Sequence, residues 1–421
     1  METKNIPLGG IRKIVGEENV REATAEDAVE GVEPSFVVEP GSIEETSELM
    51  KLAGREGLAV APRGGGTKIH IGDLPRELDL IVSIARLDEI IEHVPGDQVA
   101  RVQAGIKLED LQEHLSGSDQ MVAIDPPERG ATIGGVVAAN SSGPRRYKYG
   151  TIRDLIIGIT VVLSDGTVAK AGGKVVKNVA GYDLSKLFTG SLGTLGIIAT
   201  ANFRLHPIPE AARTVAVEIE SPQAAGEAAQ AIMHSQVEAS AVELHWGDGA
   251  GLLTVLVESI PAGVEAKAET ASFLLRPFGE VRSLEEEEME FLGPLRPPEL
   301  GDDEAAIKIA TPPAELAGVL DSVLGAAERR GVKSRIVARA ASGVTLVGLS
   351  GGDQVEFVEE MREIWTRRGG SVVLQRAPAD LKKRVGTWST GGRDDLGLMR
   401  RVKEKFDPRG ILNPGRFIGG I

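Results

Sequence analysis

The chain has 421 residues, of which 42% are hydrophobic and 26% are charged, as in an ordinary globular protein. This length favours two domains, each with its own core. The formal net charge of −15 disfavours nucleic acid and anionic membrane surfaces as partners. The absence of cysteine excludes disulfides, thiolate catalysis and Cys-ligated iron–sulfur clusters within this polypeptide.

The sequence shows no secretion or membrane signal. Its first residues lack the basic start and apolar stretch of a signal peptide, and no apolar run approaches the ~20 residues of a membrane helix. We therefore expect a cytoplasmic protein with no direct membrane insertion, which associates with a membrane, if at all, through partners.

After an N-terminal segment of residues 1–29, the first pattern is strand, helix, strand. An apolar strand is predicted at 35–38, and a helix begins at Ser42, which has capping-box spacing to Glu45. A second strand is predicted at 58–61. It leads directly into the glycine loop Pro62-Arg63-Gly64-Gly65-Gly66-Thr67-Lys68.

From Leu78 to about Leu205 most of the periodicity is strand-like. Strands are expected at 156–163 and 167–171, joined by the turn Ser164-Asp165-Gly166. The first domain is therefore predicted to be α+β, to span residues 30–209 and to end at Pro207-Ile208-Pro209.

Residues 210–385 show a different and repeated order, β-α-β-β-α-β, which predicts a duplicated ferredoxin-like domain. The first copy is expected as strand 214–220, helix 223–236, strands 240–246 and 252–258, helix 264–277 and strand 280–285. The second copy is expected as strand 305–311, helix 314–331, strands 334–341 and 343–350, helix 353–369 and strand 371–377. The acidic and proline-rich stretch 285–298 between them suits an exposed loop. Residues 386–421 form the tail, with a helix at 396–406.

The glycine loop presents closely spaced backbone N–H groups without side chains, which suits a diphosphate. A flexible loop explains an isolated glycine triplet equally well. The spacings of Walker A and of the Rossmann fingerprint are both absent. Gly190, Gly193 and Gly196 have the spacing G-x-x-G-x-x-G, which fits a loop that passes a cofactor.

Two further segments combine small residues with polar donors. The first runs from Pro126 to Pro144 and is rich in glycine, hydroxyl and amide groups. The second, 177–184, reads Lys-Asn-Val-Ala-Gly-Tyr-Asp-Leu. Taken separately, each is most simply structural.

In this order and spacing, the three segments resemble the FAD-binding domain of the vanillyl-alcohol oxidase superfamily, also called the PCMH-type domain. The resemblance spans about residues 30–210, and the tail from Phe406 to Gly415 is also similar to the family. Within it, the FAD-binding (E) subunits of glycolate-oxidase complexes are most similar, through residues 143–154 and 177–184. The cofactor-binding residues that the resemblance implies are Arg63, Gly64, Gly65, Gly66, Thr67, Lys68, Pro127, Gly130, Ala131, Thr132, Ile133, Gly134, Gly135, Asn140, Gly143, Arg145, Gly150, Arg153, Asp154, Lys177, Asn178, Gly181, Tyr182, Asp183, Gly193, Gly196 and Ile198.

The resemblance also implies how the cofactor is held and what surrounds it. Covalent members attach the flavin to a His in the glycine loop or to a Cys, whereas Thr67 or Lys68 stands here and there is no cysteine. We therefore expect non-covalent FAD. The duplicated domain matches the substrate-cap architecture of the family, with the tail returning to the FAD domain.

Candidate catalytic residues are few. The six histidines are His70, His93, His114, His206, His234 and His245, and none has metal-ligand spacing, so no metal is expected. The segment His245-Trp246-Gly247-Asp248-Gly249 is better explained as a hairpin turn. One of Arg145, Arg146, Lys148 and Arg153 could neutralise phosphate, and Trp388 and Arg393 are placed near a substrate by analogy alone. The catalytic base stays unidentified.

Three functions are compatible with these features. The leading hypothesis is the FAD-binding subunit of a glycolate-oxidase-like complex for 2-hydroxy acids, which passes electrons between a second flavin subunit and an iron–sulfur subunit. The alternatives are an autonomous FAD-dependent dehydrogenase of D-lactate or another 2-hydroxy acid, and an assembly subunit whose FAD is structural and never cycles.

Overall fold

The computed structural model describes residues 6–173, 183–247, 249–284, 301, 304–391 and 394–421. The chain divides into two compact units. The first unit comprises 1–141, 151–208 and 393–421, and the second comprises 142–150 and 209–392. The second unit resumes at Pro209, within the segment Pro207-Ile208-Pro209. The N-terminal segment belongs to the first unit, and residues 142–150 belong to the second.

The first unit begins with the predicted strand, helix and strand. Helix α2 (Ile43–Glu56) starts where the Ser42 hydroxyl accepts the amide of Glu45 and ends at Gly57, whose φ is 66°. Strands β2 and β3 lie parallel on either side of β4. The sheet order is β1-β2-β4-β3, with β1 Val20–Glu22, β2 Phe36–Val38, β3 Val60–Arg63 and β4 Leu80–Ser83. Residues 64–68 therefore follow the carboxyl end of β3.

A second, antiparallel sheet of the first unit has the order β5-β6-β10-β8-β9. Its strands are β5 Ile90–Val94, β6 Val99–Gln103, β8 Ile156–Val162, β9 Val168–Gly172 and β10 Ile197–Arg204. The pair β7 (Gln120–Met121) and β11 (His206–Pro207) is separate. The predicted turn at 164–166 joins β8 to β9, and Gly166 there has a φ of 82°.

The expectation of mainly strand-like structure between 78 and 205 is wrong over several segments, which are helical. Helix α4 is the instructive case, because its Ile and Val residues favour strands while its capping Thr132 and its alanines allow a short helix. The helices of the first unit are α1 Leu8–Val15, α2, α3 Leu108–Ser116, α4 Ile133–Ala139, α6 Ile152–Leu155, α7 Leu184–Phe188 and α14 Leu396–Phe406, with short 3-10 turns η1 Glu17–Asn19, η2 Ala25–Asp27, η3 Pro95–Asp97 and η7 Ile418–Gly420.

The second unit is built on one eight-stranded sheet of order β15-β12-β14-β13-β17-β18-β16-β19. Its strands are β12 Ala211–Ile219, β13 Ala241–Gly247, β14 Ala250–Ser259, β15 Val281–Leu284, β16 Ala305–Ala310, β17 Lys333–Arg339, β18 Val344–Ser350 and β19 Ser371–Arg376. Its helices are α5 Arg146–Tyr149, α8 Pro222–Met233, α9 Pro261–Leu275, α11 Leu316–Arg330, α12 Gln354–Arg367 and α13 Ala379–Val385, with η4 Arg276–Phe278, η5 Pro313–Glu315 and η6 Ala340–Ser342. The predicted duplication is confirmed, and β13 pairs with β17 to join the two copies.

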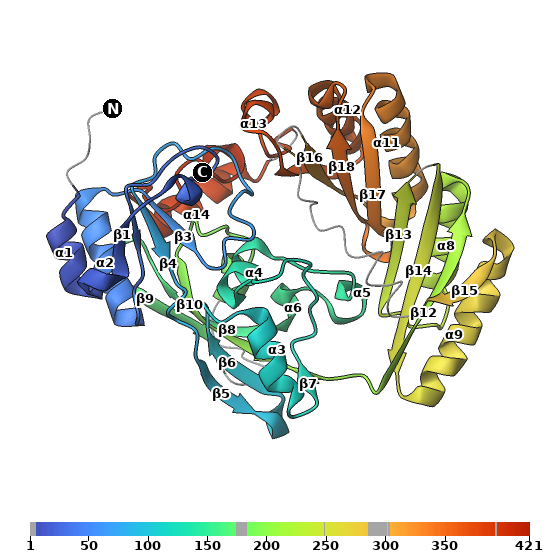
Figure 1. The fold of residues 1–421 in the computed structure, drawn as a ribbon, viewed down its shortest axis with the longest axis horizontal. Coiled ribbons are helices and arrows are strands. Elements are labelled where there is room, and N and C mark those ends of the chain that lie inside the picture. Colours follow the sequence, from blue (N-terminus) through green and yellow to red (C-terminus); the bar gives the residue numbers. More distant parts are fainter. Residues whose placement is uncertain (1–5, 174–182, 248, 285–300, 302–303, 392–393) are drawn as a thin grey trace. The chain divides into compact units, whose positions relative to one another are not determined.

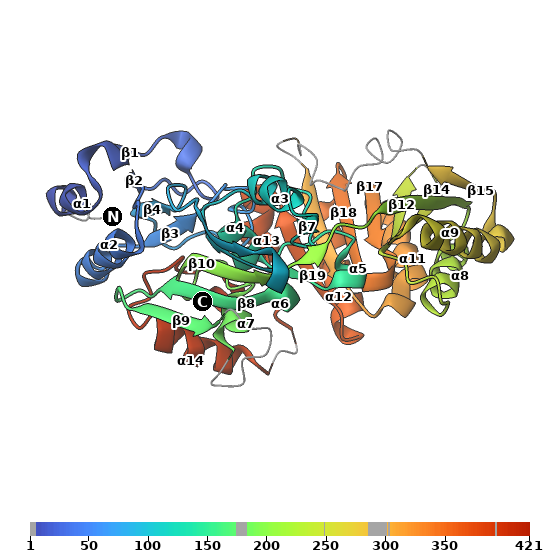
Figure 2. The ribbon, with the colours of Figure 1, turned by 90° about the horizontal axis from the view of Figure 1, so that it is seen from below.

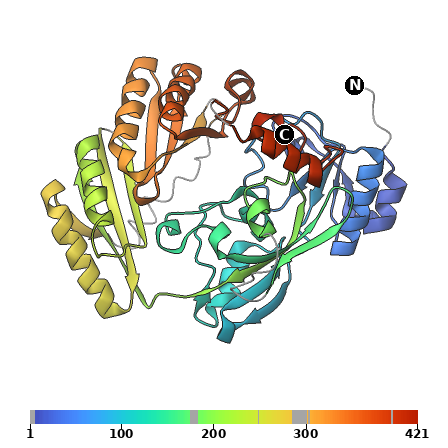
Figure 3. The same ribbon diagram turned by 180° about the vertical axis from the view of Figure 1, so that it is seen from behind.

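The long helices α8, α9, α11 and α12 all lie on one face of this sheet (Figures 1 and 3). Alternate residues of the strands, such as Leu244 and Ile336, are buried in one apolar cluster with those helices. The fully buried Trp365 of α12 belongs to this cluster, and its indole N–H donates to the Ser322 hydroxyl at 3.1 Å. The other residues of each strand face the opposite side of the sheet, which we call the open face.

The predicted helix 396–406 is present as α14 and packs in the first unit, next to its antiparallel sheet (Figure 2). The ring of Phe406 meets Phe188 edge to face at 5.5 Å between centroids. Lys403 is buried and donates to the Thr194 carbonyl at 2.8 Å, the Leu412 carbonyl at 2.7 Å and Asp407 at 2.7 Å. This ammonium therefore ties α14 both to the tail that follows it and to the turn at 191–194.

Removing the Lys403 ammonium should destabilise the first unit. Lys403→Met leaves the fully buried Asp407 carboxylate without its cation, which costs about 3 kcal/mol of unfolding free energy. Urea denaturation followed by circular dichroism measures this loss. The exposed neighbour Lys405 provides the control, and equal stability of Lys403→Met and Lys405→Met would contradict the anchoring role.

Candidate functional site

A pocket in the first unit brings together residues from the glycine loop, helix α4 and the turn before β10. Its empty space, including the part open to solvent, is about 740 Å³. Twelve of the residues predicted from the sequence line it: Arg63, Gly64, Gly65, Gly66, Thr67, Lys68, Thr132, Gly134, Gly135, Gly193, Gly196 and Ile198. Three segments that are far apart in the chain thus form one surface.

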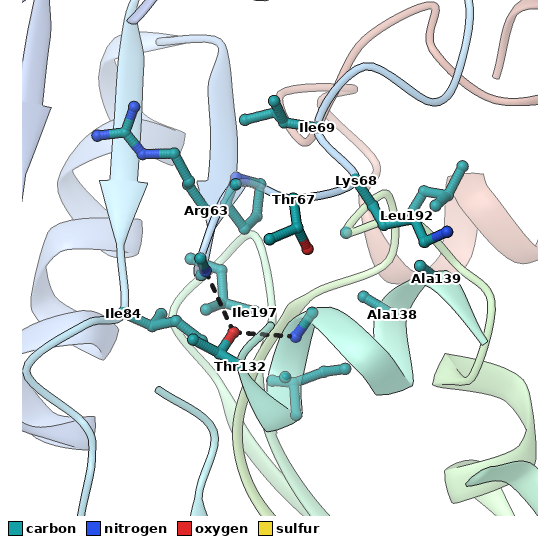
Figure 4. Close-up of a pocket in the computed structure, with 18 of the residues that line it drawn as sticks. Arg63, Thr67, Lys68, Ile69, Ile84, Thr132, Ala138, Ala139, Leu192 and Ile197 are labelled. Carbon is teal, nitrogen blue, oxygen red and sulfur yellow. Dashed lines mark hydrogen bonds between the residues drawn. The ribbon is translucent and has the colours of Figure 1, made fainter. Parts of the chain in front are cut away.

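The Thr132 hydroxyl lies between the glycine loop and helix α4 (Figure 4). It accepts the amides of Gly65 and of Gly135, both at 3.4 Å. A Cβ on Gly64 would lie 2.0 Å from this hydroxyl oxygen, and a Cβ on Gly65 would lie 2.0 Å from the Gly130 carbonyl oxygen. The two segments therefore meet backbone to backbone, which only glycine permits at these positions.

The glycine loop also offers free hydrogen-bond donors. In the part of the chain that the structure describes, the backbone amides of residues 64 and 66–68 donate to no other protein group. Gly66 has a φ of 73°, a conformation that favours glycine. A row of unused N–H groups without bulky side chains suits an anion such as a diphosphate.

The two cations of the loop are already paired. Arg63 donates to Asp27 at 2.8 Å, and Asp27 also accepts two bonds from Arg21, at 2.6 and 2.8 Å. These bonds, first the one from Arg21, hold the pKa of the Asp27 carboxyl well below its usual range. Lys68 pairs with the largely buried Glu128 at 2.5 Å. Both ion pairs fix the position of the loop.

Two residues of the C-terminal tail complete the pocket, and the sequence did not predict them. Asn413 has a φ of 45° and donates to the Leu192 carbonyl at 2.7 Å, so it holds the turn that precedes Gly193. Arg416 is buried and donates to the carbonyls of Ile69 and Ile71. Burial lowers the Arg416 pKa to about 10. The only sequence signal was the Asn413-Pro414-Gly415 turn.

The remaining predicted cofactor residues lie elsewhere. Gly130, Ala131 and Ile133 flank the pocket in sequence, and Asn140 caps α4. Pro127, Arg153, Asp154 and Asp183 do not line it, and Lys177, Asn178, Gly181 and Tyr182 lie outside the described residues. Gly143, Arg145 and Gly150 are in the second unit.

Arg145 is engaged within the second unit. Its guanidinium donates twice to the buried Glu258, at 2.6 and 3.0 Å, while the Lys148 ammonium donates to the Glu258 carbonyl. Burial, followed by the nearby charge of Glu258, raises the pKa of Tyr149 to about 12. The Arg145 charge is therefore compensated within the protein by the Glu258 carboxylate.

The described residues contain no cluster of three His, Asp or Glu side chains that could hold a metal. His93 contacts Gln120 at 3.0 Å, and His206 contacts Arg204 at 3.3 Å. His245 lies on β13, where burial lowers its pKa to about 4. Arg393 and Asp248 lie outside the described residues.

Among the helices of the described residues, none combines the length and the apolar character that a membrane-spanning segment needs.

Comparisons with known proteins agree with this site. Residues 34–172 match the model of an FAD binding domain, and residues 309–417 match the C-terminal domain of FAD linked oxidases. The chain is 27% identical to glycolate oxidase subunit GlcD of Bacillus subtilis, over 91% of this chain and 88% of that protein. It is 36% identical to a D-lactate dehydrogenase of Archaeoglobus fulgidus, over 43% of this chain and 40% of that one.

Solved structures share the fold. A p-cresol methylhydroxylase aligns with a TM-score of 0.77 and 16% identity, over 97% of this chain and 95% of that one. An alkyldihydroxyacetonephosphate synthase aligns with a TM-score of 0.74 and 18% identity, over 98% and 86%. The expected α+β, PCMH-type fold is confirmed, and FAD is the cofactor that the family match gives to the pocket. The unused loop amides and the close glycine contacts fit a cofactor of this kind.

A side chain at Gly65 should abolish FAD binding. In Gly65→Ala the new Cβ meets the Gly130 carbonyl and separates the loop from α4, and in Gly65→Asp a carboxylate also repels the diphosphate. We expect the FAD content after purification to fall at least about tenfold with the fold retained. Absorbance at the flavin band gives the FAD content, and Gly173→Ala, where a Cβ meets nothing, is the control. Full flavin content in Gly65→Ala would refute the assignment.

Asp27 should support the loop in a pH-dependent way. Its folded-state pKa is depressed, so its contribution to stability is present above the usual aspartate pKa of about 4 and is lost as pH falls further. Asp27→Asn should therefore lower the melting temperature at pH 7, and the difference from wild type should shrink below pH ~4. Thermal unfolding across pH tests this against the exposed control Asp97→Asn; a pH-independent difference would contradict it.

Proposed function

Because this chain belongs to the FAD-linked oxidoreductases, we propose that it holds FAD non-covalently in the glycine-loop pocket and serves the oxidation of a 2-hydroxy acid. The single observation that carries the proposal is the row of unused amides at residues 64 and 66–68, facing a pocket in a matched FAD binding domain. When bound, the flavin supplies the acceptor for the hydride of the alcohol carbon.

The protein would contribute position and surroundings. The amides of the glycine loop would hold the diphosphate, and the small residues Gly134 and Ala138 of α4 leave room beside it. Ile84 and Ile197 provide apolar contacts that exclude water (Figure 4). Thr67 and Lys68 cannot form the bond that a His in this loop forms in covalent relatives, and the chain has no cysteine.

The leading role is the FAD-binding subunit of a glycolate-oxidase-like complex. The match to a glycolate oxidase subunit over most of both chains supports it. Because this polypeptide has no cysteine, an iron–sulfur centre of such a complex would belong to another subunit, and a second flavin subunit is the other expected partner. The resemblance to D-lactate dehydrogenases, including the 36% identity above, favours an autonomous dehydrogenase as the second candidate.

Anaerobic spectroscopy of the purified chain separates these roles. We expect an oxidised flavin spectrum, and FAD in the supernatant after acid precipitation, because the cofactor is not covalently attached. Glycolate, D-lactate and L-lactate are then added in turn. Bleaching by one lactate enantiomer alone would make the chain a stereospecific dehydrogenase by itself.

A flavin that stays oxidised with all three acids, but bleaches when partner subunits are co-purified, would support the complex. A flavin that never bleaches in the complex would make its FAD structural. No flavin spectrum after incubation with excess FAD would refute the proposal as a whole.

A further inference from the structure

Helix α9 carries apolar side chains on its outer face. It lies at one end of the row of four long helices on the eight-stranded sheet, and α12 lies at the other end (Figure 1). Its buried residues, among them Val264 and Ala271, belong to the apolar cluster beneath it. On the opposite side, Phe273 is 69% exposed, the highest value among the large apolar residues that the structure describes. A single exposed ring is common on protein surfaces, so the residues around it decide what it means.

The residues around Phe273 form a stripe with the spacing of a coiled-coil seam. Steps of four, three, four and three residues keep the members of this stripe on one side of the helix. Two alanines lie in it beside the ring, and such small residues allow a second helix to approach closely. We call this surface the α9 stripe; its exposed residues are Ala262, Ala266, Glu269, Phe273 and Arg276, which directly follows α9.

The duplicated domain provides an internal comparison. Helix α12 occupies in the second copy the place that α9 occupies in the first, since both follow the second strand of a hairpin, β18 and β14. The exposed residues of α12 are all charged: Glu356, Glu359, Glu363 and Arg367. A helix that only covers this sheet thus carries a charged outer face. The apolar residues of the α9 stripe are not required by the fold, and they indicate a partner.

The charges along the stripe select the partner. Glu265 lies in the first half of the helix and Glu269 at its middle, whereas Arg276 follows its C-terminal end. Among the described residues, the side chains of Glu269 and Arg276 form no hydrogen bond or ion pair, and Glu265 pairs with Arg213. A surface with acids toward one end and a base at the other complements a second copy of itself that runs antiparallel. A parallel copy would place like charges together, and an anionic membrane or nucleic acid would need a positive surface.

We propose that the α9 stripe is the interface of a two-fold symmetric dimer of this chain, in which α9 of one copy packs antiparallel to α9 of the other. Phe273 of each copy then packs against the alanines of the other, and because the interface is closed each contact occurs twice. The 15 residues of α9 span about 22 Å, so one helix pair is a small interface and the affinity is moderate. The interface uses no residue of the FAD pocket and does not depend on the proposed function.

Sedimentation velocity of the purified, FAD-loaded chain measures the association. We expect a dimer with a dissociation constant of about 10 μM or lower. Phe273→Ala should raise this constant at least about tenfold, because the ring is lost from both halves of the interface. The control is Leu398→Ala, which removes an exposed apolar side chain from α14 in the first unit and should dimerise as wild type. A wild-type chain that stays monomeric at about 100 μM, or equal constants for wild type and Phe273→Ala, would overturn the proposal.

Salt distinguishes an apolar contact between like copies from an ionic contact. Two copies with a formal net charge of −15 repel each other, and salt screens this repulsion. Dimerisation through the α9 stripe should therefore tighten as NaCl is raised from about 0.05 to about 0.5 M. Association that weakens over this range would mean that ion pairs rather than Phe273 hold the copies together, and would overturn the apolar interface. A chain that is monomeric alone and associates only with a co-purified protein would overturn the choice of a second copy.

The absence of cysteine in the chain allows a direct test of the antiparallel geometry. Glu269→Cys places one thiol near the two-fold axis, and mild oxidation should link two copies through a disulfide. Ala262→Cys should not link, because antiparallel packing separates the two positions by at least about 16 Å. Glu363→Cys on the exposed face of α12 is the control for random collisions and should stay unlinked. Linking of Ala262→Cys without linking of Glu269→Cys would overturn the antiparallel arrangement.

A stability readout separates the interface from a structural role of the ring. Phe273 is exposed and lies outside the FAD pocket, so Phe273→Ala should keep the flavin content of wild type. At a concentration where both chains are monomeric, the two should also unfold at the same temperature. A lower melting temperature of monomeric Phe273→Ala would mean that the ring stabilises its own unit, and would overturn the proposal.

Discussion

The pocket exists because two segments more than sixty residues apart meet without side chains between them. Gly64 and Gly65 leave no room for a Cβ against Thr132 and the Gly130 carbonyl. That contact sets the direction of the loop, keeps its following amides away from protein acceptors and links β3 to the start of α4. A single added methyl group would separate the surfaces, so the rest of the site depends on this steric constraint.

Three side chains of the C-terminal tail also hold the segments that form the pocket. Lys403, Asn413 and Arg416 each donate from the tail to backbone carbonyls of a pocket segment, the first two at Thr194 and Leu192 and the third at Ile69 and Ile71. Carbonyl acceptors hold a segment without imposing a charge on it. The tail therefore closes the pocket while leaving the amides of the glycine loop for the cofactor.

The sequence predicted elements better than it predicted contacts. The duplicated β-α-β-β-α-β order was readable because each copy repeats the same alternation, and α2 was readable from Ser42 and Glu45. Helix α4 was missed because β-branched residues hid a helix set by its Thr132 cap. Asn413 and Arg416 could not be predicted, since their partners lie more than two hundred residues away and a backbone carbonyl leaves no trace in sequence.

Burial changes how the polar residues of the second unit are interpreted. From the sequence, His245 stood out because a histidine before Gly-Asp-Gly resembles a motif, whereas Arg145 was one of four cations considered for phosphate. In the structure, the Arg145 guanidinium pairs with the buried carboxylate of Glu258. An exposed carboxylate needs no partner, but a buried one does, so this pairing can be interpreted only once the burial of Glu258 is known.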